Sequence, residues 1–300
     1  MEEWCKEKEA EKVECWTVSE RTRRITYAVM AAPASVAIVY LGDWVLAIVL
    51  SVLAALGAWE FFRMARETGA LPLEPAGIAL AALLPIAVHA HRLGVYTLSM
   101  TAIVAMILVL FASTIWLRGP SGKPVASVAI TVFGVFYAGL FSYIYALRYH
   151  DYAIGMGAHT VLVFLPVLLT WATDVGAYTF GRTFGKKKLI PSVSPGKTVE
   201  GAVGGLGLAI VICLLYVRFI LMPYAQLGLT IQGAVLFAIV VSVAAQTGDL
   251  AESLLKREAG VKDSSRILPG HGGFMDRLDS PLFVMPIAFL LLVPLWLPIP

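Results

Sequence analysis

The sequence predicts an all-α integral membrane protein, a polytopic bundle of about nine transmembrane helices. Two observations of composition point there: 59% of the residues are hydrophobic and only 14% are charged. A soluble globular domain carries about 25% charged residues. The third observation is that apolar runs long enough to cross a bilayer recur along the chain, while the charged residues gather between them.

Nine apolar runs account for the predicted helices in chain order. They cover residues 25–40, 44–62, 73–89, 94–117, 125–146, 160–180, 201–222, 229–252 and 281–296. The first and last runs are the shortest, so eight or ten spans stay open. No internal repeat is evident, and an inverted-repeat transporter therefore gains no support from the sequence.

The basic residues predict the orientation of the bundle. Of the 23 Lys and Arg residues, 20 lie in the first 24 residues or in the loops after spans two, four, six and eight. Only Arg92, Arg148 and Arg218 lie elsewhere. Because Lys and Arg are enriched in cytoplasmic loops, the N-terminus is expected inside and the C-terminus outside. The same count places loops 181–200 and 256–280 together on the cytoplasmic face.

The chain divides into a tail and one domain. Residues 1–24 carry seven acidic and six basic side chains and form a charged cytoplasmic N-terminal tail. Residues 25–300 are expected to form a single transmembrane domain, with the chemically informative half at about 157–280. The three Cys residues show no CxxC pairing, which indicates neither a disulfide framework nor a zinc site. A formal charge of +3 is too small to suggest a nucleic-acid partner.

Polar side chains within the predicted spans are the first candidates for a site. Asp174 lies late in span six, and Gln246 and Asp249 lie late in span eight. A carboxylate at mid-membrane costs about 2.5–3.5 kcal/mol on insertion scales, so these groups should face a cavity or a partner rather than lipid. Gln246, Asp249, Ser253 and Lys256 share one helical face. The plainer alternative is that Asp249 is a helix-end residue in the interface.

Residues 256–279 form the most charged segment after the tail. Asp276 and Asp279 are three apart, so on a helical turn they would share a side, an arrangement that a divalent cation stabilises. Hard oxygen ligands without Cys favour magnesium. The segment's basic residues suit phosphate oxygens, and the combination is typical of phosphoryl or nucleotidyl transfer. They are Lys256, Arg257, Lys262, Arg266 and Arg277. The positive-inside rule alone would explain the basic residues, but not the acids or the glycines.

Glycines surround a single histidine in this segment. Gly270, Gly272 and Gly273 flank His271 and would allow backbone NH groups to approach an anion closely. A lone His in such a loop is more often structural than catalytic.

The second cytoplasmic segment, 181–201, contains Gly196-Lys197-Thr198. It is no phosphate-binding P-loop, because Pro191 stands where the first glycine should be and no strand precedes it. Ser194 or Thr198 is instead expected to cap span seven. Lys197 and the run 186–188 supply positive charge, although the run alone is explained as a topology signal.

These residues together resemble the signature of the phosphatidate cytidylyltransferases, also called CDP-diacylglycerol synthases. The resemblance rests on Ser253-x-Leu255-Lys256-Arg257, Lys262-Asp263 and Pro269-x-His271-Gly272-Gly273-Phe274-x-Asp276-Arg277-Leu278-Asp279. It extends to Asp174-Val175-Gly176-Ala177-Tyr178, Gly181-Arg182 and Ser194-Pro195-x-Lys197-Thr198-x-Glu200-Gly201. Gly196 stands where many members have a second Lys. The first half resembles the family only as a hydrophobic scaffold.

The resemblance implies a membrane enzyme with cytoplasmic catalytic loops that converts CTP and phosphatidate to CDP-diacylglycerol and pyrophosphate. It implies a Mg²⁺ cofactor, with a second, monovalent cation left open, and a possible homodimer in the inner (plasma) membrane. Asp249 and Asp276 are the expected metal ligands. The expected catalytic residues are these two with Lys256, Arg257, Lys262 and Arg277. The expected substrate-binding residues are Ser194, Lys197, Thr198, Ser253, Asp263, His271, Gly272, Gly273 and Asp279, the last being also a weaker third metal candidate.

Two other functions stay open. A CTP-dependent lipid kinase would transfer the γ-phosphoryl group and release CDP. A secondary transporter could use Asp174 and Asp249 in an ion path.

Overall fold

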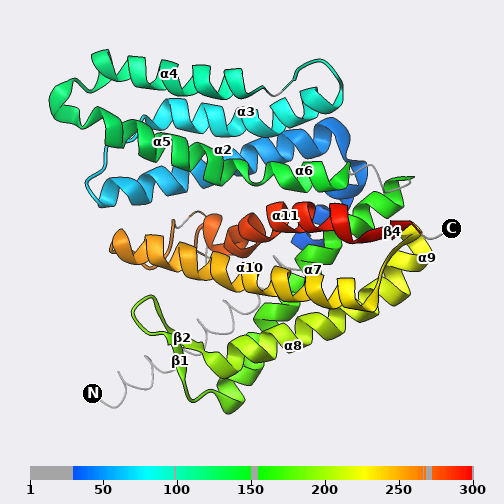
Figure 1. Ribbon diagram of the computed structural model, residues 1–300. Coiled ribbons are helices and arrows are strands. Elements are labelled where there is room, and N and C mark those ends of the chain that lie inside the picture. The colour runs from blue at the N-terminus through cyan, green and yellow to red at the C-terminus, as the bar shows by residue number, and fades with distance from the viewer. Residues whose placement is uncertain (1–29, 98, 150–154, 266, 268–271, 299–300) are drawn as a thin grey trace, which may run out of the picture.

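The computed structural model describes residues 30–97, 99–149, 155–265, 267 and 272–298. The helices form two layers, α2 to α6 and α7 to α11 (Figure 1). The helices of the first layer are α2 (Asp43–Glu67), α3 (Glu74–Arg92), α4 (Met100–Leu117), α5 (Pro124–Gly139) and α6 (Ser142–Arg148). Those of the second are α7 (Gly155–Phe184), α8 (Val199–Tyr216), α9 (Met222–Ala225), α10 (Ile231–Glu258) and α11 (Met275–Leu295). A short helix, Met30–Leu41, precedes α2.

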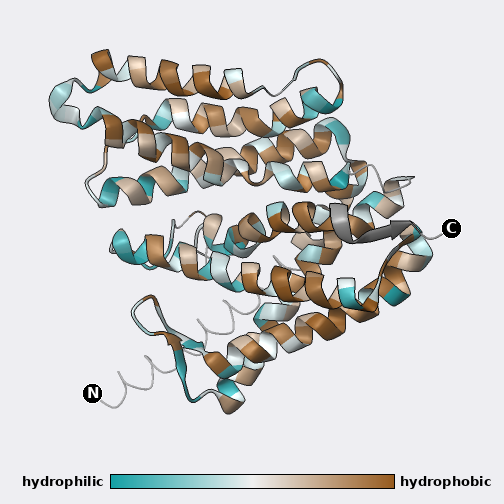
Figure 2. Ribbon diagram, in the orientation of Figure 1, coloured by the Kyte–Doolittle hydropathy of each residue, from teal (hydrophilic) through white to brown (hydrophobic). Residues whose placement is uncertain are grey.

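The helices have the length and composition of membrane spans. Seven helical segments in the described part of the chain are long and apolar enough to cross a bilayer. Hydrophobic residues cover the middle of most helices, and hydrophilic residues gather at their ends and on the β1–β2 hairpin (Figure 2). Of the nine predicted runs, the first corresponds to the short Met30–Leu41, and the last falls within α11 except for its final residue, which begins β4. The protein is therefore a polytopic, nearly all-α membrane protein, as the composition predicts.

Several boundaries differ from the sequence prediction. The fourth span begins at Met100 rather than residue 94, and the fifth is broken between α5 and α6. The eighth continues to Glu258, so Lys256 and Arg257 lie on the last turn of α10 rather than in a loop. Two small antiparallel β pairs also interrupt the helical fold. Strands of three to five residues are too short to show an apolar periodicity from which they could be predicted.

Close packing of α7 on α8 fixes one wall of the second layer. A Cβ added to Gly176 would lie 2.8 Å from the Cα of Gly205, and one added to Gly205 would lie 2.6 Å from the carbonyl oxygen of Thr173. Small residues at a helix crossing let the backbones approach, which is how helices associate inside a membrane. The crossing lies one helical turn or less from Asp174 and Ala202, so it sets the distance between the helices that carry them.

A β-hairpin joins α7 to α8. Strand β1 (Lys188–Ile190) pairs with β2 (Ser194–Thr198). The Thr198 hydroxyl caps α8 by accepting a hydrogen bond from the Gly201 amide at 3.1 Å, which confirms one of the two predicted caps. The Glu200 carboxylate accepts bonds from the Lys186 and Lys187 amides at the base of the hairpin. A second pair, β3 (Leu227–Leu229) with β4 (Trp296–Pro298), joins the chain before α10 to the chain after α11.

The described parts of the loops predicted to be cytoplasmic lie at one end of the bundle, where α2, α4 and α10 end and the β1–β2 hairpin projects (Figure 1). Two basic residues outside this pattern are held at the other helix ends. The buried Arg148 donates from Nε to the Val39 carbonyl at 2.7 Å and from Nη2 to the Tyr40 carbonyl at 3.1 Å. Arg92 stacks 3.6 Å above the Tyr149 ring centroid. Structural contacts thus explain two exceptions to the charge asymmetry.

Candidate active site

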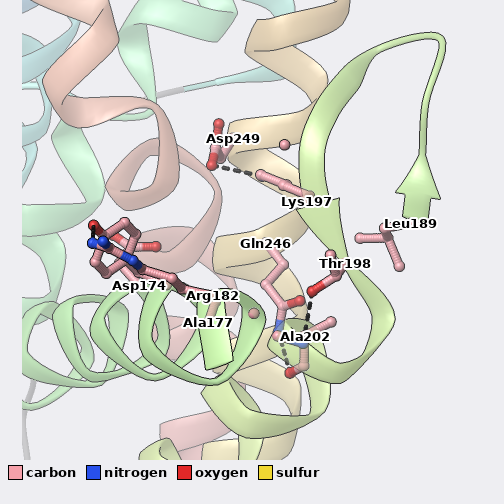
Figure 3. A pocket seen from close by; sticks show the side chains of 13 residues that line it. Asp174, Ala177, Arg182, Leu189, Lys197, Thr198, Ala202, Gln246 and Asp249 are labelled. Atoms are coloured by element: carbon pink, nitrogen blue, oxygen red, sulfur yellow. Dashed lines mark hydrogen bonds and ion pairs between the residues drawn. The ribbon is translucent and has the colours of Figure 1, made fainter. Parts of the chain in front are cut away.

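A cavity of about 520 Å³ opens between α7, the β1–β2 hairpin, α8 and α10 (Figure 3). Asp174 and Arg182 reach it from α7, and Gln246 and Asp249 from α10. Asp174, Gln246 and Asp249 were predicted to face a cavity or a partner rather than lipid, and all three line this cavity. The remaining lining residues are Ala177, Tyr178, Gly181, Leu189, Gly196, Lys197, Thr198, Gly201 and Ala202. Its volume lies within the range of about 300–1,000 Å³ that small-molecule sites occupy.

Lys197 bridges the hairpin to α10. Its ammonium lies 2.6 Å from Oδ2 of Asp249, and both side chains remain partly exposed, at 26% and 35% (Figure 3). The Arg257 Nε donates to the Val193 carbonyl at 3.3 Å and ties the hairpin tip to the end of α10. Two predicted residues from separate segments, Lys197 and Asp249, are thus brought together at the cavity.

The predicted polar face of α10 exists, but its members contact different neighbours. Gln246 donates to the Ala202 carbonyl at 3.3 Å and so faces α8. Asp249 faces the hairpin, Ser253 is half-buried, and Lys256 faces α11. The face therefore runs from the helix crossing, past the cavity, to the first turn of α11.

A buried charge group lies where α10 meets α11. The Lys256 ammonium is 3.0 Å from Oε2 of Glu252 and 2.7 Å from Oδ1 of Asp276. Glu252 is fully buried, and Asp279 interacts electrostatically with both Glu252 and Asp249. The buried group and the cavity are thereby coupled. Glu252 is a member that the sequence analysis missed, although its spacing from Lys256 is that of a helical ion pair.

Asp276 is held by four hydrogen bonds. Besides Lys256, the Ser264 amide at 2.9 Å, the Ser264 hydroxyl at 3.0 Å and the Gly273 amide at 2.7 Å donate to it. Burial alone would raise the pKa of the Asp276 carboxyl, but Lys256 and the two amides outweigh it, so that pKa lies below its ordinary value. Asp276 lies before the apolar run that starts at Pro281, and it is ionised at neutral pH.

Glu60 of α2 is a second carboxylate that the sequence analysis missed. It is fully buried, and two hydroxyls and two backbone amides donate to it. The donors are Ser264 Oγ at 3.1 Å, Ser265 Oγ at 2.5 Å, Phe274 N at 2.8 Å and Met275 N at 2.6 Å. An acid inside the apolar run 44–62 was a visible signal, but its partners lie more than 200 residues away in the sequence.

The remaining predicted site residues that the structure describes lie outside the lining of the cavity. Lys262, Asp263 and Arg277 are exposed beyond α10 and on the first turn of α11, and Ser194 is half-buried at the start of β2. Gly272 has a positive φ of 80°. A Cβ on Gly273 would lie 1.8 Å from Ser264 Oγ, so packing of the loop already requires glycine there. His271 lies outside the described residues.

The acids suit a hard cation, but no complete metal site is formed. Asp174, Asp249, Glu252, Asp276 and Asp279 outnumber Lys197 and Lys256, and this excess of carboxylates would favour a divalent cation. Within the described residues, however, no three His, Cys, Asp or Glu side chains are grouped to hold a metal ion. Asp249 and Asp276 each pair with a lysine instead.

Comparisons with known proteins identify the family of the chain. A family model described as the cytidylyltransferase family matches residues 22–295. A phosphatidate cytidylyltransferase of Synechocystis is 31% identical over 299 residues, covering 91% of this chain and 96% of the relative. One from Staphylococcus haemolyticus is 45% identical over 166 residues, covering 55% of this chain and 59% of the relative. One from Staphylococcus saprophyticus is 40% identical over 197 residues, covering 65% and 70%. The chain thus spans from about three fifths to nearly all of the length of these relatives.

Proposed function

The chain belongs to the cytidylyltransferase family, and from that premise we propose that it transfers the cytidylyl group of CTP to phosphatidate. The products are CDP-diacylglycerol and pyrophosphate. The observation that carries the proposal is the cavity in which Lys197 of the hairpin meets Asp249 of α10, a cationic and an anionic group at one end of apolar helices. The reaction needs a site that an anionic nucleotide can enter from water and that an anionic lipid headgroup can reach from the membrane surface. A charged cavity at one end of the apolar helices meets this need.

The cavity's basic residues are the proposed binding groups for the CTP phosphates. Lys197 and Arg182 line it, and charge-assisted hydrogen bonds from such groups are the strongest that phosphate oxygens receive. Arg182 donates to the Tyr178 hydroxyl at 3.0 Å, which orients its guanidinium along α7. The exposed Arg257, Lys262 and Arg277 are proposed to attract the nucleotide from the cytoplasm.

Asp249 and Asp276 are the proposed ligands of a Mg²⁺ ion. Both offer the carboxylate oxygens that Mg²⁺ prefers. To bind a metal, Asp249 would have to weaken its ion pair with Lys197, and Asp276 would have to weaken its ion pair with Lys256. When bound, the ion would neutralise charge on the phosphates as the transferred group moves. The released Lys197 and Lys256 would then be available to phosphate oxygens.

The proposed reaction is an in-line displacement at phosphorus. A phosphate oxygen of the lipid forms a bond to the α-phosphorus of CTP, and the bond from that phosphorus to the bridging oxygen of the β-phosphate breaks. Because the lipid phosphate is already ionised, no general base is needed. The contribution of the chain is to position the substrates and to neutralise charge, which dominates catalysis of this class.

The proposed location is the cell inner (plasma) membrane, with the N-terminus and the site on the cytoplasmic side. This orientation is supported by the 20 of 23 basic residues in the tail and the even-numbered loops, and by the gathering of those loops at one end of the bundle (Figure 1). A homodimer stays a proposal that rests on the family resemblance alone.

The proposed function can be tested with CTP that is labelled at one of two phosphate positions. The purified protein in detergent is incubated with phosphatidate, Mg²⁺ and CTP labelled at the α or the γ position. We expect the α label in the lipid and the γ label in pyrophosphate. A γ label in the lipid would identify a lipid kinase instead. No transfer by folded protein, together with saturable substrate flux into sealed vesicles, would favour a transporter.

A further inference from the structure

Glu60 connects the first helical layer to the loop that carries the predicted site residues. Its helix, α2, belongs to one layer, and its four donors lie in the other layer, three after the end of α10 and one on the first residue of α11 (Figure 1). The first half of the chain resembles the family only as a hydrophobic scaffold. The contacts of Glu60 indicate a more specific role for this half.

Three donors bind the Glu60 carboxylate without competition, and the Ser264 hydroxyl is a fourth donor that Glu60 shares with Asp276. Oε1 accepts from the Ser265 hydroxyl and the Phe274 amide, and Oε2 accepts from the Ser264 hydroxyl and the Met275 amide. The Glu60 carboxylate therefore holds two separate chain segments, 264–265 and 274–275, together at one point.

The two segments that Glu60 holds together also position Asp276. Ser264 donates its amide to Asp276, and its hydroxyl lies within hydrogen-bond distance of both Asp276 and Glu60. A hydroxyl has one proton, so it serves one carboxylate at a time. Met275, which donates its amide to Glu60, directly precedes Asp276. Movement of Glu60 would thus be transmitted to Asp276 and, through it, to Lys256.

We propose that Glu60 is a positioning residue, which fixes Asp276 and Lys256 for cytidylyl transfer by holding residues 264–265 and 274–275 in place. The proposal rests on the proposed function for its kinetic part. Its structural part, the fixing of these four residues, is independent of which reaction the protein catalyses.

The test replaces Glu60 by Gln, which keeps the size but brings an NH₂ group against two amide or hydroxyl donors. We expect Glu60→Gln to lower kcat about 10- to 100-fold, the effect of losing buried hydrogen bonds to a charged group. The KM for CTP should change little, because the cavity residues are not touched. The Phe274 and Met275 amides should exchange hydrogen faster than in the unaltered protein.

Two further variants separate positioning from general destabilisation. Thr131→Val removes a buried hydroxyl of α5, which bonds the Ser127 carbonyl at 2.7 Å and the Leu73 amide at 2.8 Å, far in sequence from the loop. It should lower thermal stability while leaving kcat and exchange at Phe274 unchanged. Ser265→Ala removes a single donor of Glu60 and should show a weaker form of the Glu60→Gln effect; it also serves if Glu60→Gln does not fold.

The outcomes are distinct. A folded Glu60→Gln protein with unchanged kcat and unchanged exchange would overturn the inference, as would equal losses of kcat in Glu60→Gln and Thr131→Val. If the unaltered protein transfers no cytidylyl group, the proposed function fails. The exchange measurement then still decides whether Glu60 fixes residues 264–265 and 274–275.

Discussion

Replacing Lys256 by Met should destabilise the protein strongly, because it leaves buried carboxylates without their counter-charge. Lys256 is only 14% exposed and lies 2.7 and 3.0 Å from carboxylates that are 9% and 0% exposed. At an effective dielectric constant of about 20, each contact attracts with about 5 to 6 kcal/mol. Most of that offsets the desolvation of the three groups, and removing one partner of a buried pair costs a net of about 3–5 kcal/mol.

The cost should be visible as a fall in Tm of about 10 °C, measured by tryptophan fluorescence of the purified protein in detergent. Lys262→Met is the matched control, since Lys262 is exposed and surface substitutions usually change stability by less than about 0.5 kcal/mol. Adding Asp276→Asn to Lys256→Met should recover part of the loss, because it removes the charge that Lys256 compensates. If Lys256→Met has the same Tm as the unaltered protein, the reasoning that the buried carboxylates need the charge of Lys256 is refuted.

Four further results are expected. Asp249→Asn should abolish CTP turnover in a folded protein, and near-normal activity would remove Asp249 from the metal role. Lys197→Ala should raise the KM for CTP about 10- to 100-fold through loss of a charged phosphate contact; an unchanged KM would count against its place in the substrate site. Gly205→Ala should lower the Tm, since its Cβ would lie 2.6 Å from a carbonyl oxygen, whereas Gly207→Ala, with open space around it, should not. Folding lowers the pKa of Asp276. The ionised Asp276 therefore stabilises the fold above the ordinary Asp pKa of about 3.9, and this contribution is lost as pH falls through the lowered value. The difference in Tm between the unaltered protein and Asp276→Asn should accordingly shrink in acid.

Composition and apolar runs were enough to predict the fold class and most helices, because the cost of polar groups in lipid leaves few alternatives. The same cost predicted that Asp174, Gln246 and Asp249 face a cavity or a partner rather than lipid, and all three line the cavity. The small strands were not predictable from an apolar pattern. Strands β1 and β2 form because the chain turns at Pro191 and the two segments pair antiparallel.

Side-chain partners were harder to predict than positions. The sequence identified Asp249 and Asp276 as candidate metal ligands, but their pairing with Lys197 and Lys256 depends on how the hairpin and α11 fold back on α10. Glu60 was missed because a carboxylate near the end of an apolar run resembles an ordinary interface residue. Only the structure brings the Ser264 and Met275 donors to it.

The long sequence separation within the Glu60 contact has a consequence for biosynthesis. Its donors follow it by 204 to 215 residues. At a translation rate of about 5–20 residues per second, roughly 10 to 40 s pass before the ribosome has added them. During that interval the nascent chain carries an acid without its donors in a helix bound for the bilayer, so α2 is expected to keep Glu60 near the aqueous interface until residues 264–275 arrive. A chain that stops before residue 264 would lack all four donors of this acid.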